Sequence, residues 1–342
     1  MNIQSASRSL AMASVALTSV AAAHAQSEAG FGDSGWFLRA DASARFNVKA
    51  SISRTRPLLS PGTYDNGFVL PDIGGTASGK TWNWGYNTLD QNVGGQLVLS
   101  RLDGVPGLAG QDLNVNSPLL GGELIGGYNF SPFQIGHRNA RFAFEIGYGY
   151  SGFSENINLA ESGTAALRTD SFGLGGIIPP LPPYAGTATG PGPLIDLNPS
   201  SQNVTVSPVT TAFRGSLETT FHDFRIGPAF SMDLTRRLTA AIGAGYSSVY
   251  IGSRVSYVES VNFSNPAMPA ISPGSTDFSK GSWYPGVYAE GRLHYRITDF
   301  LDVFVGGDIR HNGKLKFGDA AREVTIDITT TYAAKAGLTF QF

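Results

Sequence analysis

The sequence predicts an all-β protein, folded as a closed antiparallel eight-stranded transmembrane β-barrel with long extracellular loops. Three observations lead to this prediction. Apolar and polar residues alternate along eight segments, and in seven of them the apolar face carries no charged residue. The chain also combines 43 Gly with 21 Phe and 13 Tyr. Glycine weakens ordinary strands whereas aromatic residues favour them, and transmembrane barrels use both.

The composition excludes several classes of protein. The chain has 342 residues, of which 42% are hydrophobic and 15% are charged. This differs from disordered chains and allows one large domain or two. The absence of cysteine excludes disulfide bonds, thiolate metal sites and thiol chemistry. The net charge of −2 points to neither a nucleic-acid partner nor a basic helix on a membrane surface.

Residues 1–25 have the three parts of a secretory signal peptide. Arg8 lies in the positive region, an apolar run extends from Leu10 to Ala22, and Ala23-His24-Ala25 forms an A-x-A cleavage site. An apolar run of about a dozen residues is too short for a transmembrane helix, which needs roughly 20. We therefore expect a signal peptide that is cleaved on export, and a barrel domain over 26–342.

The first strand is expected at 36–52 and the last at 324–342. On the first, the alternating apolar residues run from Trp36 to Ile52 and include Val48 and Ala50. On the last, the apolar face includes Val324, Ile326, Ile328, Tyr332, Leu338, Phe340 and Phe342. The same pattern predicts strands at 119–130, 140–153, 212–233, 237–256, 283–297 and 301–311. The two longest connections, about 53–118 and 154–211, are expected to be extracellular loops.

Charged residues gather on the opposite face of these strands. They are Arg39, Asp41, Arg45, Lys49, Glu123, Arg141, Glu145, Glu290, Arg292, Arg296, Asp302, Asp308, Arg310, Asp327 and Lys335. We expect the apolar face to contact lipid and the charged face to line the lumen. Backbone groups in lipid must all be paired, which requires closure of the sheet. Seven acids and eight bases are nearly balanced, so the lumen should hold an ion-pair network that plugs the narrow barrel.

The fourth predicted strand changes its pattern in the middle. Its outward apolar set would shift from Phe213 and Phe221 to Phe224 and Ile226, and a β-bulge near His222 and Asp223 would restore the alternation. Pro228 is also unfavourable there, because proline cannot donate to the ladder.

The connections alternate between long and short, which is typical of outer-membrane barrels with long outer loops and short periplasmic turns. The end of the chain adds a motif. Phe342, with Phe340, Leu338 and Tyr332 on one face, resembles the β-signal of such proteins. The chain resembles the small bacterial outer-membrane β-barrel proteins typified by the membrane domain of outer membrane protein A.

This resemblance implies a location in the cell outer membrane of a Gram-negative bacterium. It also implies contact with outer-membrane lipid and lipopolysaccharide, recognition by the barrel assembly machinery, and a monomer. Outer membrane protein A continues into a peptidoglycan-binding domain. Here the chain is expected to stop at Phe342, so no role in anchoring to the cell wall is implied.

The long loops hold candidate contact residues. Tyr64, Phe68, Trp82, Trp84 and Tyr86 lie beside turn-forming residues, and such clusters could bind a ligand or a partner surface. Alternatively, they pack the loop onto the barrel rim. Loops of this length are unusual unless they are functional or disordered. Additional strands within them, at 93–101 for instance, would enlarge the barrel to ten or twelve strands.

The sequence offers no clear catalytic site. His137, His222, His294 and His311 are not spaced as metal ligands, and the carboxylates of Glu145 and Glu290 have arginine neighbours that favour ion pairing. We expect no enzyme, no cofactor and no metal. The leading hypothesis is a non-catalytic membrane protein that anchors long surface loops for surface interaction or a membrane-structural role. The alternatives are a porin-like channel for small solutes and, less favoured, a lipid-modifying barrel enzyme.

Overall fold

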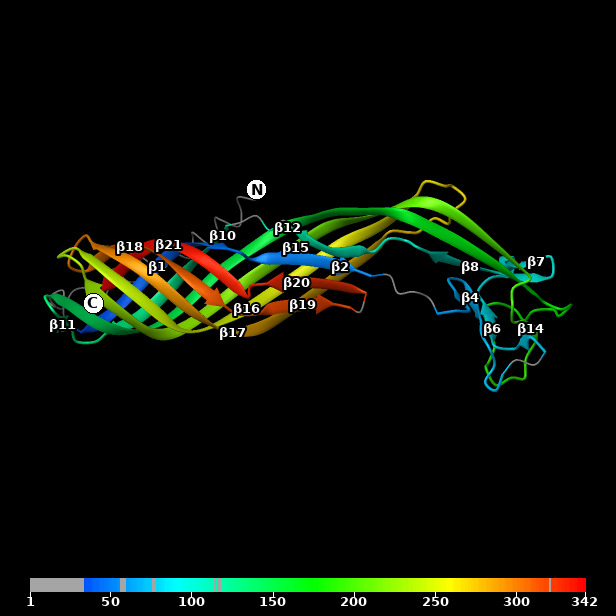
Figure 1. The fold of residues 1–342 in the computed structure, drawn as a ribbon, viewed down its shortest axis with the longest axis horizontal. Coiled ribbons are helices and arrows are strands. Elements are labelled where there is room, and N and C mark those ends of the chain that lie inside the picture. The colour runs from blue at the N-terminus through cyan, green and yellow to red at the C-terminus, as the bar shows by residue number, and fades with distance from the viewer. Residues whose placement is uncertain (1–33, 56–59, 76–77, 114, 116–117, 320) are drawn as a thin grey trace.

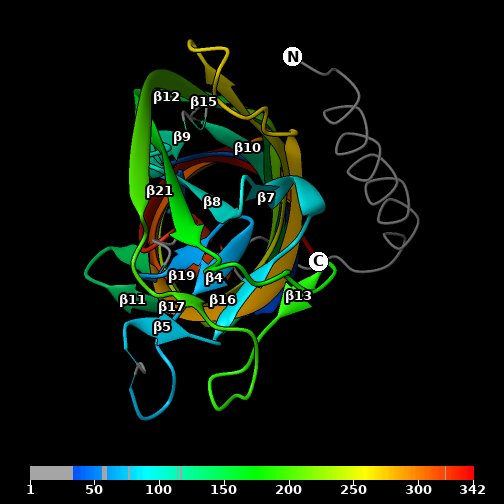
Figure 2. The ribbon, with the colours of Figure 1, turned by 90° about the vertical axis from the view of Figure 1, so that its right-hand side faces the viewer.

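The computed structural model describes residues 34–55, 60–75, 78–113, 115, 118–319 and 321–342, so the predicted signal peptide at 1–25 lies outside the described residues. Among these residues, eight strands pair antiparallel in chain order, and the last pairs with the first. They are β1 (Gly35–Phe46), β10 (Leu119–Asn129), β12 (Arg138–Gly173), β15 (Ser201–Asp233), β16 (Leu238–Phe263), β17 (Gly274–Arg296), β18 (Leu301–His311) and β21 (Thr330–Gln341). The predicted closed eight-stranded barrel is confirmed, and Figure 2 shows its ring end-on.

One end of the barrel, here called the turn end, carries short connections. The turn at 234–237 joins β15 to β16, and the turn at 297–300 joins β17 to β18. β11 (Phe133–Ile135) forms a hairpin with the start of β12. The C-terminus lies at the same end, where the Phe342 N–H donates to the Trp36 carbonyl at 2.9 Å (Figure 1). No helix in the described part of the chain is long and apolar enough to cross a bilayer.

Four strands continue far beyond the ring at the other end (Figure 1). β12, β15, β16 and β17 have 36, 33, 26 and 23 residues, whereas a transmembrane strand needs about 9–11. β12 and β15 stay paired without interruption from Ala140↔Met232 to Ser171↔Ser201. Much of the predicted loop 154–211 is therefore strand. The alternation in this stretch is weak, because both faces carry many small polar residues.

The continued strands and a second sheet form a stalk. The second sheet has the order β19 (Lys314–Gly318), β20 (Arg322–Asp327), β2 (Lys49–Arg54) and β9 (Leu108–Leu113). Part of the predicted loop 53–118 thus belongs to the stalk. The predicted strand 36–52 is interrupted between β1 and β2, where Asn47 has a φ of 63°. The predicted strand 324–342 is interrupted between β20 and β21.

The interior of the stalk is mainly apolar. Its core comprises Val48, Ala50, Ile52, Leu108, Leu113, Val115, Leu119, Ile157, Phe213, Leu217, Phe221, Val249, Ile251, Val255, Tyr257, Leu315, Phe317, Val324, Ile326 and Ile328. The prediction that the apolar residues of 48–52 and 324–328 face outward with Tyr332 is wrong. The two interruptions shift the alternation, so that these residues point inward.

The predicted β-bulge near His222 and Asp223 is also wrong, because β15 keeps its register on both sides there. Phe213 and Phe221 point inward into the stalk core, while Phe224 and Ile226 point outward from the barrel. The odd-numbered residues of β15 face inward throughout, first in the stalk core and then in the lumen of the barrel. Pro228 is accommodated at a gap in the β15–β16 ladder, whereas its pairing with Phe144 on β12 continues.

A small folded tip lies beyond the stalk and comprises the described residues of 60–103 and 172–200. Its main sheet has the order β13 (Tyr184–Ala185), β6 (Trp84–Tyr86), β4 (Gly67–Val69) and β3 (Thr63–Tyr64). It also contains the pair β5 (Lys80–Thr81) and β14 (Ile195–Asp196), the 3-10 helix η2 (Leu89–Gln91), and β7 (Asn92–Val93) beside β8 (Gln96–Asp103). The additional strand considered at 93–101 exists as β8. It pairs with the far part of β12, so the barrel does not grow.

The stalk core should contribute strongly to stability. We expect Phe213→Ala to lower the free energy of unfolding by about 3–5 kcal/mol, because Phe213 is fully buried and its truncation leaves a cavity. Urea unfolding in lipid vesicles, followed by tryptophan fluorescence, measures this change. Val258→Ala on the outer face of β16 is the control and should change stability by less than about 0.5 kcal/mol. Equal effects of the two substitutions would contradict an apolar stalk core.

Candidate functional site: the charged lumen and the tip

The lumen of the barrel is lined by charged residues at alternate positions of the ring strands. Inside it lie Arg39, Asp41, Arg45, Glu123, Glu145, Asp223, Arg225, Glu290, Arg292, Asp308, Arg310 and Lys335. Alternation along each strand sends these side chains to one face, and closure of the ring brings them together from seven strands. We call this set the lumen network.

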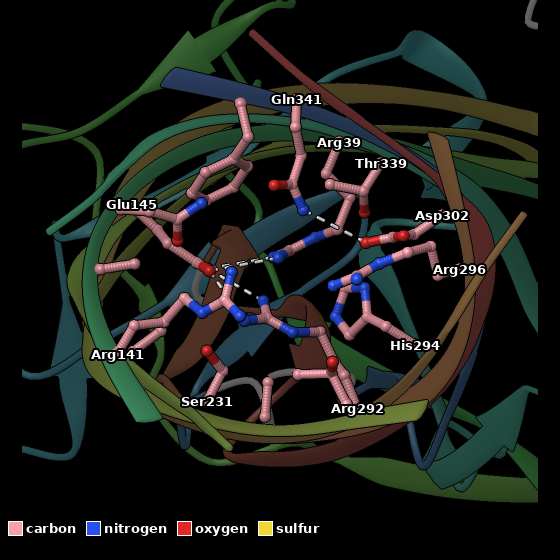
Figure 3. Close-up of a pocket in the computed structure, with 16 residues that line it drawn as sticks. Arg39, Arg141, Glu145, Ser231, Arg292, His294, Arg296, Asp302, Thr339 and Gln341 are labelled. Atoms are coloured by element: carbon pink, nitrogen blue, oxygen red, sulfur yellow. Dashed lines mark hydrogen bonds and ion pairs between the residues drawn. The ribbon is translucent and has the colours of Figure 1, made fainter. Parts of the chain in front are cut away.

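Glu145 on β12 lies at the centre of the part nearest the turn end. The Arg39 guanidinium donates to its two carboxylate oxygens at 3.1 and 3.0 Å, and Arg292 donates to the same oxygens at 2.7 and 2.9 Å (Figure 3). Each arginine thus makes a bidentate pair, the strongest geometry for such ions. Both arginines also contact Glu290, which pairs with Arg225 at 2.6 Å.

A second part of the network lies toward the stalk. The Lys335 ammonium is 2.6 Å from both Glu123 and Asp308, and Arg310 contacts the same two carboxylates. Arg45 reaches Asp308 at 3.4 Å. Arg225 and Lys335 join the two parts, since Arg225 lies 3.7 Å from Glu123 and Lys335 lies 3.9 Å from Glu290.

The charges of the lumen network balance, with six acids and six bases. A buried ion without a partner destabilises a protein by several kcal/mol, and here nearly every ion has at least two opposite charges beside it. Asp41 is the exception, because neither of its carboxylate oxygens has a hydrogen-bond partner among the described residues. The network fills the lumen in the way that a narrow barrel allows.

Sequence reasoning missed two members, Asp223 and Arg225. Both alternate with Phe224 and Ile226, which were predicted to face outward. This alternation is the sequence signal that could have placed Asp223 and Arg225 in the lumen. Two residues predicted to line the lumen lie in the stalk instead. Lys49 is exposed, and Asp327 pairs with Lys314 at 2.8 Å. Both follow from the interruptions that separate the stalk strands from β1 and β21.

The remaining predicted lumen residues lie at the turn end. Arg141 pairs with Asp233 at 3.1 Å, and Asp302 accepts a hydrogen bond from Gln341 at 3.2 Å beside Arg296. Except for Asp233, these groups line a cavity of about 60 Å³ together with His294 (Figure 3). The His294 ring stacks on Phe304, with 5.3 Å between the ring centroids. A second cavity of about 30 Å³ lies between the lumen network and the stalk core. Spaces of this size hold a few water molecules.

The candidate loop contacts lie in the tip, where they mainly form its own core. Trp84 and Tyr86 are buried, and both rings pack on Tyr184 at 4.6 and 6.4 Å. The Trp84 indole N–H donates to the Pro193 carbonyl at 2.8 Å. Tyr64 packs against the same core. Phe68 and Trp82 are half-buried. The structure therefore places Tyr64, Trp84 and Tyr86 in the core of the tip, and all five residues lie away from the barrel rim.

Tyr64 also makes the main polar contact of the tip. Its hydroxyl donates to Oδ2 of the fully buried Asp170 at 2.6 Å, and Arg168 Nε donates to the same carboxylate at 2.9 Å. Burial and this hydrogen bond raise the pKa of Tyr64 above its usual value, so its hydroxyl keeps its proton in ordinary solutions. The bond ties β3 to the far part of β12.

The remaining predicted residues can be placed as follows. Tyr332 and Phe342 are exposed on the outer face at β21 and its end, with Leu338 and Phe340 half-buried on the same face. His222 lies outside the barrel, where Tyr148 contacts its Nδ1 at 2.8 Å. Within the described residues, no three His, Asp or Glu side chains are grouped so that they could hold a metal ion.

The chain has the architecture of an outer-membrane β-barrel: a closed ring, an apolar outer face and a charged lumen. No family model matches the sequence, and no curated protein matches it.

Solved structures give only distant likenesses. The attachment invasion locus protein Ail of Yersinia pestis is 5% identical, with a TM-score of 0.27, over 90% of this chain and 99% of that one. The outer membrane protease OmpT of Escherichia coli is 11% identical, with a TM-score of 0.33, over 93% of this chain and 99% of that one. A FadL homologue of Pseudomonas aeruginosa is 9% identical, with a TM-score of 0.19, over 91% of this chain and 90% of that one.

The lumen network should depend on each of its partners. We expect Arg292→Met to lower the free energy of unfolding by about 3–5 kcal/mol, because it leaves Glu145 and Glu290 buried with one fewer positive charge. The urea midpoint in lipid vesicles measures the loss. Arg254→Met is the matched control, because Arg254 pairs with Asp277 on the exposed surface and should have no measurable effect. An Arg292→Met variant with unchanged free energy of unfolding would show that the lumen charges are not energetically coupled.

The Tyr64 hydrogen bond should stabilise the tip. We expect Tyr64→Phe to weaken the protection of tip amides from hydrogen exchange by about 1 kcal/mol, and the exposed Tyr246→Phe to leave it unchanged. Because folding raises the Tyr64 pKa, the stabilisation is complete below its ordinary pKa of about 10 and is lost as the pH rises through the raised value. A difference between wild type and Tyr64→Phe that already declines between pH 7 and about 9 would contradict this assignment.

Proposed function

We propose that the chain is a non-catalytic integral protein of the outer membrane, whose plugged barrel anchors a rigid stalk and presents the folded tip to surfaces outside the cell. The observation that carries this proposal is the inversion of polarity along continuous strands. Around the ring, apolar side chains such as Ile146, Ile242 and Val305 are more than half exposed on the outer face. Along the stalk, most large apolar side chains turn inward and most polar ones face outward.

This inversion matches two different solvents. An exposed apolar band around a charged interior is stable in lipid, whereas an apolar interior under a polar surface is stable in water. Aromatic side chains mark both limits of the band. Tyr148, Tyr150, Tyr246 and Trp283 are exposed near the stalk, and Trp36, Phe142 and Tyr295 near the turn end, as at membrane interfaces.

The orientation follows from the connections. Short turns are typical of the periplasmic side, so the turn end would face the periplasm and the stalk would project from the cell. The outer face would contact outer-membrane lipid and lipopolysaccharide. The barrel assembly machinery would bind the outward side chains of Tyr332, Leu338, Phe340 and Phe342, and the barrel would be a monomer within its membrane. Export would begin with the signal peptide.

A non-catalytic role is supported by the way in which the lumen carboxylates are used. Glu145 and Glu290, the pair that could share a proton in an enzyme, are each held by at least two guanidinium groups. This environment favours permanent ionisation over proton transfer. A porin-like channel is less favoured, because the lumen network and then the stalk core fill the path that a solute would take.

The orientation can be tested in intact cells with a membrane-impermeant maleimide, since the chain contains no cysteine of its own. We expect Ser256→Cys, on the exposed outer face of the stalk, to be labelled. Asp299→Cys, in an exposed turn at the other end, is the matched control and should react only after the outer membrane is permeabilised. Labelling of Asp299→Cys alone would invert the proposed orientation.

The plug can be tested by conductance in planar bilayers. We expect the wild type to be silent. Arg292→Ala should produce small, flickering currents, because it removes a side chain that bridges Glu145 and Glu290. Steady, large conductance of the wild type would favour the porin-like alternative.

A further inference from the structure

One stretch of β15 near the tip has a partner on one side only. β12 pairs with β15 as far as Ser171↔Ser201, whereas the β16 ladder ends at Val209↔Phe263. Residues 201–206 are therefore an edge, which we call the β15 edge. In Figure 1, β12 and β15 extend together beyond the other long strands toward the tip.

The backbone groups that face this edge can be identified. The Ser264 N–H donates to the Pro208 carbonyl at 3.0 Å, so even-numbered residues of β15 face the side of β16. Because strand residues alternate in the direction of their N–H and C=O groups, Gln202, Val204 and Val206 present theirs to the β15 edge. No described residue donates to or accepts from these groups.

The opposite edge of the same small sheet is protected. On β8, Ser100 N–H donates to Asn66 Oδ1 at 2.9 Å and Leu102 N–H donates to Asp65 Oδ2 at 2.8 Å. The Asp65 N–H also donates to the Ser100 carbonyl at 2.9 Å. Natural edges are commonly protected by charges, prolines or bulges. Residues 201–206 have none of these. No charged residue occurs from Leu197 to Phe213, the register with β12 is unbroken, and the nearest prolines, Pro199 and Pro208, lie outside this stretch.

We propose that the β15 edge pairs antiparallel with the same edge of a second copy of this chain, carried by a facing membrane. A two-fold axis at Val204 places Val204 opposite its own copy and Gln202 opposite Val206. Every outward backbone group of the three residues then gains a partner in both copies. The uncharged side chains allow this self-pairing, because no like charges meet across the axis.

The direction of the strand selects the facing membrane. The stalk strands run along the long axis of the molecule, away from the barrel (Figure 1). An antiparallel partner related by a two-fold axis across the strand has its barrel pointing in the opposite direction. A barrel in the same membrane cannot take that orientation. The inference rests on the proposed function only in requiring that the stalk lie outside the membrane.

The test uses the full-length protein in vesicles of phosphatidylethanolamine and phosphatidylglycerol at low ionic strength, with clustering followed by light scattering. Wild-type vesicles should cluster. Val204→Lys and Val204→Glu should each reduce clustering at least about fivefold, because like charges then meet at the axis. Mixing vesicles that carry Val204→Lys with vesicles that carry Val204→Glu should restore clustering. Val204 is 55% exposed, so both variants should fold.

Val258→Lys is the matched control. Val258 is 45% exposed on the same outer surface, but it is paired on both sides, with Arg214 and Ser275. This variant should cluster like the wild type. Dispersed wild-type vesicles, undiminished clustering of both Val204 variants, or a mixture that stays dispersed would each overturn the proposal. Labelling of Ser256→Cys reports the position of the stalk independently, so failure of the edge pairing is distinguishable from failure of the proposed function.

Discussion

The unbroken antiparallel ladder between β12 and β15 is the constraint on which the rest of the molecule depends. A β-ladder fixes which side chains face inward for as long as its register holds. Here the register holds from the turn end to the tip, so that Arg225 in the lumen and Phe213 in the stalk face the same interior. The strands do not change direction or parity between the two regions. The chemistry of the inward residues changes instead.

That change explains how one sheet can keep a single strand register in both lipid and water. A one-residue slip would exchange the two faces of a strand. In the barrel the slip would place Glu145 in lipid, and in the stalk it would place Phe213 in water. Both errors are costly. Because the strands are continuous, the register that is favoured in the barrel is also the register that is favoured in the stalk. The transition falls between Phe221 and Asp223, which are successive inward positions of β15.

The parts that sequence reasoning predicted are those governed by local alternation and charge. The eight ring strands and most lumen residues have this signal, because lipid tolerates no charge on the outer face. Asp223 and Arg225 were missed because Phe213 and Phe221 were assumed to face lipid as Phe224 does, which gave the strand an apparent change of parity next to Asp223. That assumption fails once a strand leaves the membrane. The tip could not be predicted, because its shortest strands have two residues each and depend on distant contacts such as Trp84 with Pro193.

The position of the aromatic residues bears on how the tip and stalk could recognise anything. Trp84 and Tyr86 would be effective contact residues on a surface, but both are buried in the tip core, where the Tyr86 hydroxyl donates a hydrogen bond to the Pro180 carbonyl. The β15 edge itself exposes neither aromatic rings nor charges, so it cannot rely on such side chains for its affinity. Backbone groups at an unprotected strand edge supply hydrogen bonds without either. The packing that places these aromatic rings in the tip core therefore favours recognition by strand pairing, and the stalk strands carry that edge away from the barrel.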